Sequence, residues 1–360
     1  MTRSASAVIW RLLPAMILLF ILSGCASFRV GMGNAAIELP PVTIIGDPTG
    51  RRSDIYDAYD LFDRADKAFV LADWPRAEKL YQLLLAKYPT GEVTPLGRYN
   101  LGLVYERTQQ WEKALRTYNG FGDNPGKGLR IEEVRLRKAV CLSRLGRYEP
   151  AQQQLEMILR QFGVPPLEYN EARARLGIAY FRVGDEILAE HHLRPALDVY
   201  ERNAARGVMH ARAAYAEGYF ALGEIDFARF RAIELVGDEN ALARALGEKA
   251  DAFVAARNYY TLAIRTYEPE WVVASLFRVG LGYELFYEAV LAAPLPGDLT
   301  AGEQKEYRQK LREKLQPVLN KALQAYRRNL ELAGDFHVET QFVEQTRKRY
   351  ATLSRNAQQD

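Results

Sequence analysis

The chain has 360 residues, of which 26% are charged, and its formal net charge is +3. So small a charge excess gives a folded body no strong electrostatic preference for a polyanion such as nucleic acid. The sequence contains two cysteines, Cys25 and Cys141. An intrachain disulfide is therefore excluded if Cys25 is chemically modified.

An export signal is predicted at the N-terminus. Two arginines accompany the apolar run 12–22, which is shorter than the roughly 20 residues that span a bilayer. The next residues, Leu22-Ser23-Gly24-Cys25, resemble the lipobox of bacterial lipoproteins. This resemblance implies that residues 1–24 are removed, that the sulfur of Cys25 receives diacylglycerol and that its new amino group is acylated. Because Ala26 rather than Asp follows, the resemblance also implies an anchor in the outer membrane, on its periplasmic face.

Residues 25–53 are expected to be a lipidated, flexible tether. They show little helical periodicity and are rich in proline and glycine. Within them, the short apolar run Val42-Thr43-Ile44-Ile45 could either add as a strand to a partner or pack on the folded body.

A regular spacing of small residues dominates residues 54–236. Alanine recurs at steps of 37, 37, 38 and 39 residues, and a second small residue stands 12 places before each alanine. The five pairs are Ala65 and Ala77, Gly102 and Ala114, Ala139 and Ala151, Gly177 and Ala189, and Ala216 and Ala228. Two helices approach closely only where their side chains are small, so each pair predicts one helical hairpin. A series of such hairpins stacks into a solenoid.

These units resemble the tetratricopeptide repeat, which also places an aromatic or large apolar residue one turn after the second small residue. Tyr81, Tyr118, Leu155 and Leu193 stand at that place. The resemblance implies an all-α, tetratricopeptide-like solenoid of five hairpins over residues 54–236. Four units carry an arginine where the family favours a bulky apolar residue: Arg98, Arg135, Arg173 and Arg212.

Residues 237–360 are predicted to be extra C-terminal helices. Gly280, Tyr283 and Ala292 fit a partial sixth unit. Long helices are expected over 240–267, 269–292 and 303–333, the third kinked or divided at Pro317, and a final helix over 338–353 is expected to cap the solenoid.

The resemblance further implies a protein-binding groove lined by the first helix of each hairpin. The side chains at the corresponding places are Phe62, Phe69, Tyr99, Arg107, Arg144, Phe181, Arg182 and Phe220. Three arginines recur there at one repeat position among aromatic residues. They could pair with carboxylates of a partner, or they could only oppose the dipoles of the helix ends.

Signatures of catalysis, metal binding and nucleotide binding are missing from the sequence. The candidate metal ligands His191, His192 and His337 lack the further ligands that zinc needs, and no phosphate-binding loop joins a strand to a helix. We therefore expect no cofactor, no metal, no nucleotide and no nucleic acid.

The function expected from these features is that of a non-catalytic, lipid-anchored scaffold. Its partners would be other envelope proteins, in outer-membrane protein assembly, secretin or pilus assembly, or motility machinery. Its contact with outer-membrane lipid would be the acylated Cys25. Two alternatives stay open: an envelope regulator that activates a peptidoglycan synthase, and a lytic enzyme, which the absence of a paired acid and a cleft disfavours.

Overall fold

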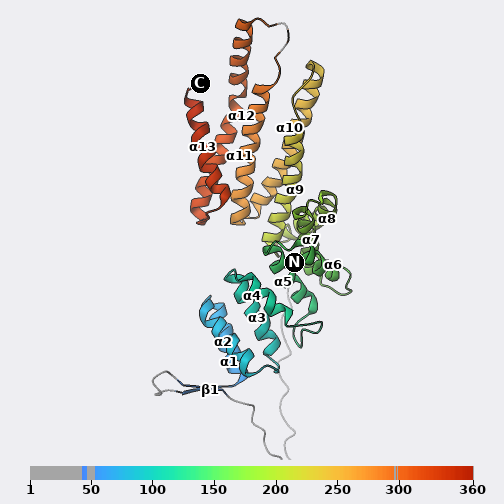
Figure 1. Cartoon of the computed structure of the whole chain (residues 1–360), viewed down its shortest axis with the longest axis vertical. Helices are drawn as coiled ribbons and strands as arrows, with labels where there is room; N and C mark the ends of the chain where they lie inside the picture. The colour runs from blue at the N-terminus through green and yellow to red at the C-terminus, as the bar shows by residue number, and fades with distance from the viewer. Residues whose placement is uncertain (1–42, 47–52, 296, 298, 360) are drawn as a thin grey trace, which may run out of the picture. The chain divides into compact units, whose positions relative to one another are not determined.

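The computed structural model describes residues 43–46, 53–295, 297 and 299–359, which belong to one compact unit, Val42–Asp360. These residues form thirteen α-helices and one two-stranded β-hairpin (Figure 1). The predicted all-α, tetratricopeptide-like solenoid with extra C-terminal helices is confirmed. The predicted signal 1–24, the lipidation site Cys25 and most of the predicted tether lie outside the described residues. No helix in the described part of the chain is long and apolar enough to cross a membrane.

Eight helices form four successive hairpins, as the small-residue spacing predicts. The pairs are α1 (Ala58–Val70) with α2 (Trp74–Lys87), α3 (Thr94–Arg107) with α4 (Trp111–Asn119), α5 (Ile131–Arg144) with α6 (Tyr148–Leu159), and α7 (Pro166–Arg182) with α8 (Glu186–Ala204). The turn of each hairpin has one residue with positive φ at the same repeat position: Ala72, Gln109, Gly146 and Gly184. Asp73 and Asp185 cap α2 and α8 by accepting hydrogen bonds from backbone N–H groups.

The paired small residues lie where the two helices of a hairpin meet. Ala77, Ala114, Ala151 and Ala189 are all completely buried. A Cβ atom on Gly102 would come within 2.4 Å of the Tyr118 ring, so this ring occupies the space that a larger residue would need. The Tyr118 hydroxyl donates to Glu106 at 2.7 Å, which satisfies the polar end of a buried aromatic side chain.

Two of the arginines at the unusual repeat position contact residues at helix C-termini. Arg98 donates to the backbone oxygen of Gly120, the residue that caps the C-terminus of α4. Arg135 donates to the side chain of Gln161, just beyond the end of α6. A cation at a helix C-terminus opposes the helix dipole, and its long stem packs along the stack.

The predicted fifth hairpin is wrong. α9 runs without a break over Arg212–Ala232, so Ala216 and Ala228 lie on one helix, and Ala228 is exposed. The partner of α9 is α10 (Glu239–Arg265). Gly223 stands at the repeat position where Gly146 and Gly184 form turns, but it remains helical. A Cβ atom there would meet the Tyr260 ring at 2.6 Å, so its missing side chain admits a ring from α10 instead of making a turn.

The same small-residue contact recurs between α11 (Pro269–Ala292) and α12 (Ala301–Phe336). Gly280 faces Tyr326, whose ring a Cβ atom would meet at 2.5 Å, and Ala322 is fully buried one turn before that tyrosine. The predicted partner of Gly280, Ala292, is instead the last residue of the same helix. α12 contains Pro317 and is not divided there. α13 (Gln341–Gln359) packs against α11 and α12.

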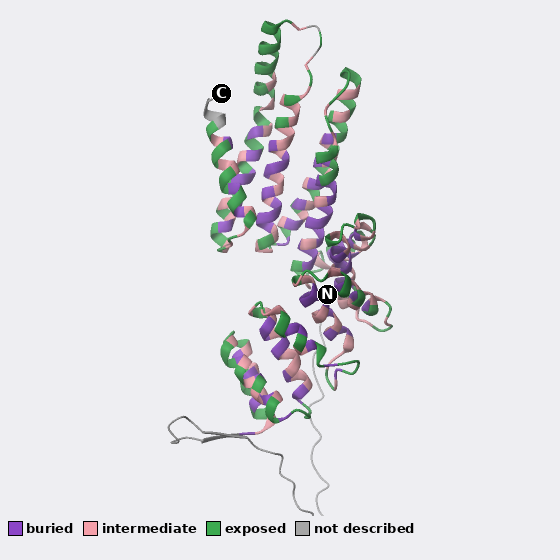
Figure 2. Ribbon diagram, in the orientation of Figure 1, coloured by how far each residue is buried: buried purple, intermediate pink, exposed green. Residues whose placement is uncertain are grey.

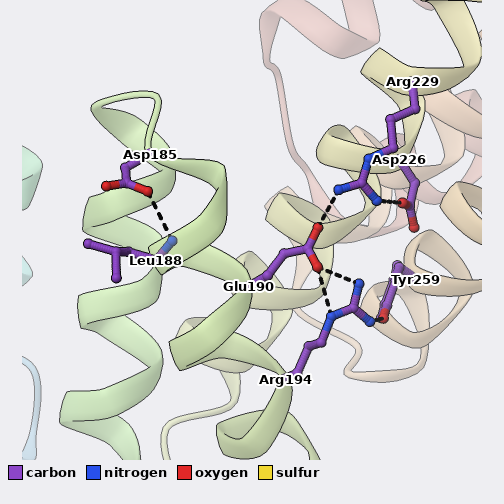
Figure 3. A network of polar contacts seen from close by, with 7 residues as sticks. All are labelled: Asp185, Leu188, Glu190, Arg194, Asp226, Arg229 and Tyr259. Carbon is purple, nitrogen blue, oxygen red and sulfur yellow. Dashed lines mark hydrogen bonds and ion pairs between the residues drawn. The ribbon is translucent and has the colours of Figure 1, made fainter.

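A polar network joins the fourth hairpin to the helices that follow (Figure 3). Glu190 of α8 accepts from Arg194 of the same helix at 2.8 Å and from Arg229 of α9 at 2.6 Å. Arg229 also donates to Asp226, and Arg194 donates to the hydroxyl of Tyr259 on α10. Three helices are thus linked through one carboxylate.

The end of the predicted tether differs from expectation. Strands β1 (Thr43–Gly46) and β2 (Ser53–Tyr56) pair antiparallel, with Ile44 opposite Ile55. The run that could have joined a partner sheet therefore pairs within the chain. Tyr56 at the end of β2 is buried, and its backbone oxygen accepts from the Tyr88 hydroxyl at 3.0 Å, which attaches the hairpin to the first helical repeat.

Among the C-terminal helices, buried residues lie where α9 to α13 pack together, whereas the far ends of α10 and α12 are exposed (Figure 2). The buried aromatic residues Phe220, Phe230, Phe253, Phe277 and Tyr326 form the centre of this part of the core.

Candidate protein-binding groove

A cavity of about 530 Å³ lies along the first helices of the second, third and fourth hairpins and along the start of α9. A neighbouring cavity of about 230 Å³ shares Val140, Arg144, Arg175 and Glu217 with it. We call the two together the groove. The first helices of three hairpins, α3, α5 and α7, thus line this surface, whereas α1 contributes no residue to it.

The groove is rich in charge of both signs. Six arginines and four glutamates line it: Arg107, Arg137, Arg144, Arg175, Arg182 and Arg212, and Glu106, Glu171, Glu217 and Glu268. Each glutamate is paired with one arginine. Arg137 contacts Glu106 at 3.2 Å, Arg175 contacts Glu171 at 2.7 Å, Arg182 contacts Glu217 at 2.8 Å, and Arg212 contacts Glu268 at 3.1 Å.

Two arginines remain after these pairs are formed. Neither Arg107 nor Arg144 has an ion pair or a side-chain hydrogen bond with another residue of the described ranges, and both are exposed. The Arg144 guanidinium lies 5.8 Å from the centre of the Trp111 ring, at a cation–π distance. Arg107, Trp111 and Arg144 therefore form a receptive site for a carboxylate, with an aromatic face beside it.

The most deeply buried charge in the groove is Glu171, which is 2% exposed. Burial alone would raise the pKa of its carboxyl group. The neighbouring Arg175, the hydrogen bond from His210 and the charge of Arg137 outweigh burial and lower this pKa to about 2. Glu171 is therefore ionised at neutral pH, and it holds Arg175 and His210 at the floor of the groove.

The other predicted groove residues have different surroundings. Phe62, Phe69, Tyr99 and Phe181 are half-buried and pack on the core. Arg182 lies at the edge of the groove but is held by Glu217. Phe220 is 6% exposed, with its ring 5.6 Å from Tyr260 and 5.2 Å from Trp271, so its expected place on the binding surface is wrong. The reason is that α10 and α11 pack over this face of α9.

The sequence analysis missed several groove residues. Trp111 and Tyr148 begin the second helices of two hairpins, outside the helices used for prediction. Arg137 and Arg175 recur at one repeat position, and that recurrence is the signal by which they could have been found. His210 and Glu268 lie outside the repeat pattern, so no spacing points to them.

Cys141 has no place in the groove. It is fully buried on α5, and burial raises the pKa of its thiol to about 12. A thiol with so high a pKa carries little thiolate at neutral pH and is unreactive.

Comparison with known proteins agrees with the repeat class. The tetratricopeptide repeat family model matches residues 97–125, which include α4 and most of α3. No curated protein matches the chain.

Solved structures that resemble the chain include a tetratricopeptide repeat protein from Parabacteroides merdae, with 14% identity and a TM-score of 0.41, covering 82% of this chain and 98% of that one. A TPR repeats protein from Bacteroides fragilis has 14% identity and a TM-score of 0.27, covering 82% and 99%. Yeast Tom70 has 12% identity and a TM-score of 0.27, covering 77% and 76%. Identities and TM-scores this low say nothing about the function of this chain.

Proposed function

We propose that this protein is a lipid-anchored assembly scaffold of the bacterial envelope, which holds an acidic segment of another envelope protein in its groove. The observation that carries the proposal is the pair of unpaired arginines, Arg107 and Arg144, which line the same cavity as Trp111. Stacked tetratricopeptide-like hairpins are protein-interaction modules, and a surface of this kind suits an extended partner segment.

The expected partner segment carries carboxylates with aromatic or aliphatic residues between them. Its carboxylates would receive hydrogen bonds from Arg107 and Arg144, while an apolar side chain would cover Trp111. The four internal ion pairs keep the surrounding groove close to neutral. This arrangement favours a few well-placed carboxylates over a dense polyanion.

The proposed location rests on the sequence of the N-terminus. The lipobox-like Leu22-Ser23-Gly24-Cys25 and the following Ala26 support attachment to the periplasmic face of the outer membrane. Two or three acyl chains would give a stable anchor, whereas one chain alone binds a bilayer only marginally. In a Cys25→Ser variant we expect loss of acylation and of membrane association, measured by membrane fractionation. Normal processing of that variant would refute the anchor.

The groove is tested by charge reversal. Arg107→Glu and Arg144→Glu should each weaken partner binding by about 1–3 kcal/mol, because each places a carboxylate against a carboxylate. Arg327→Glu, an exposed position on α12, is the matched control and should bind normally. The partner would first be captured by wild type and identified, and affinities and melting curves would then be measured for all variants. Unchanged affinity in both groove variants would refute the groove as the binding surface.

A further inference from the structure

The segment between α8 and α9, residues 205–211, forms one wall of the groove through Met209, His210 and Ala211. Residues 205–209 are exposed. Among the seven residues of this segment, all of which the structure describes, His210 is the one whose side chain forms a hydrogen bond or ion pair. Its Nε2 atom lies 2.8 Å from Oε2 of Glu171, on the floor of the groove.

The segment also carries local strain. Ala211, at the start of α9, has φ of +51°, in the left-handed region that an alanine disfavours. α9 has no side-chain cap at this end. The backbone N–H groups of residues 205–208 donate to carbonyl groups at the end of α8. For residues 209–211, the contact between His210 and Glu171 is the side-chain polar contact that the segment itself provides.

We propose that residues 205–211 are a pH-sensitive wall of the groove, which protonated His210 fastens to Glu171 and which loosens when His210 loses its proton. This inference rests on the proposed function, because it describes how that same groove is regulated. Deprotonation would remove the imidazolium charge, and loosening would leave Oε2 of Glu171 without its donor. Both changes make the groove less attractive to an acidic segment.

The surrounding charges define the direction of the effect. Glu171 and Glu168 of α7 favour the imidazolium form, whereas Arg137 of α5 disfavours it. Arg175 of α7 holds the other oxygen of Glu171, and on the far side Arg212 of α9 is neutralised by Glu268 at the start of α11. The hydrogen bond with Glu171 is the largest influence and raises the pKa of His210 above its ordinary value. The ion pair is thus complete below the ordinary pKa of histidine, and its ionic contribution is lost as the pH rises through the raised value, above which neutral imidazole keeps a single N–H donor.

The wall is tested first without any partner. The His210 imidazole would be titrated by NMR in the full chain, and amide hydrogen exchange of residues 206–211 would be compared at pH 6.0 and 8.5 after correction for intrinsic rates. Wild type should lose protection at pH 8.5. A His210→Gln variant can donate to Glu171 at both pH values, so its protection should not change. Equal protection of wild type at the two pH values would overturn the proposal.

The second arm uses a fluorescent peptide, Glu-Asp-Phe-Glu-Asp-Tyr-Glu-Asp, whose carboxyl groups are ionised throughout this pH range. Its affinity for wild type should fall about two- to fivefold between pH 6.0 and 8.5, the range expected for one partly exposed ion pair. His210→Gln should abolish this dependence. His191→Gln, an exposed histidine on α8, is the matched control and should retain it.

The two arms separate the two hypotheses. A wall that responds to pH in a protein that does not bind the peptide would refute the acidic-segment groove and leave the wall established. Peptide binding whose pH dependence is the same in wild type and His210→Gln would refute the wall and leave the groove intact.

Discussion

The closest helix contacts in this chain each depend on one small residue that faces a ring or a leucine. In the hairpins with small residues 12 positions apart, the second helix follows at once, and its alanine reaches the first small residue. Between α9 and α10 the same contact is made by Gly223 with Tyr260, and Ala256, one turn before that tyrosine, is also completely buried. The chemistry of the contact is unchanged, although the sequence separation is much larger.

The pairing of α9 with α10 predicts that leucine will affect stability differently at two alanines. Ala256→Leu should destabilise the protein by about 1–3 kcal/mol, because the added atoms enter a closed contact. Ala228→Leu, at the position that the simple repeat spacing favours, should change stability by less than about 0.5 kcal/mol because Ala228 is exposed. Chemical denaturation of both variants measures the difference. Equal destabilisation by both substitutions would show that Ala228 is buried and would refute the α9–α10 pairing.

At the scale of elements, the long α9 needs a partner for its C-terminal carbonyl groups. Lys249 of α10 supplies it: its Nζ donates to the backbone oxygen of Phe230 at 2.9 Å and to that of Ile233 at 2.8 Å. Lys249 is 5% exposed, and burial lowers the pKa of its ammonium group. A buried lysine thus caps one helix from the next and fixes where α9 ends.

Lys249→Met should therefore destabilise the protein by about 1–3 kcal/mol, because one buried and one partly buried carbonyl group lose their donor while the packing volume is largely kept. Lys310→Met, which removes an exposed ion pair with Glu306 on α12, should have an effect below about 1 kcal/mol. Thermal melts of the two variants would decide between them. A variant at residue 249 that is as stable as the one at residue 310 would show that the cap contributes nothing.

At the scale of the whole molecule, the predicted domain boundary at residue 236 cuts between α9 and its partner. Phe220, Phe227 and Phe230 on α9 are buried against residues of α10, α11 and α13. The hairpins and the C-terminal helices therefore share a core through α9.

A fragment that ends at residue 236 should expose these three phenylalanines, at about 1.5–3 kcal/mol each. We expect it to melt at a lower temperature than the full chain, to bind a hydrophobic dye and to be cut by protease within α9. Limited proteolysis with mass spectrometry measures the last effect. A fragment with the melting temperature of the full chain and an intact α9 would show that the boundary at residue 236 is a true domain boundary.

The sequence by itself determined the repeat class, the four first hairpins and the helices that line the groove. These depend on short-range spacing: two small residues 12 positions apart meet as soon as the chain turns back. The sequence also indicated Arg107 and Arg144, because both stand at the same position of successive repeats. The sequence did not determine whether a glycine forms a turn or makes room for an aromatic ring. Gly184 and Gly223 occupy the same repeat position, and only the approach of Tyr260 distinguishes them.

The tertiary structure decided the rest, since those features depend on what comes to cover each face. Phe220 is part of the core because helices distant in the sequence pack on it. Arg182 forms an ion pair with Glu217 of α9. The wall at His210 exists because a connecting segment happens to lie over the buried Glu171. Burial and charge pairing between residues 35 or more positions apart leave no period in the sequence, so they could be read only from the folded chain.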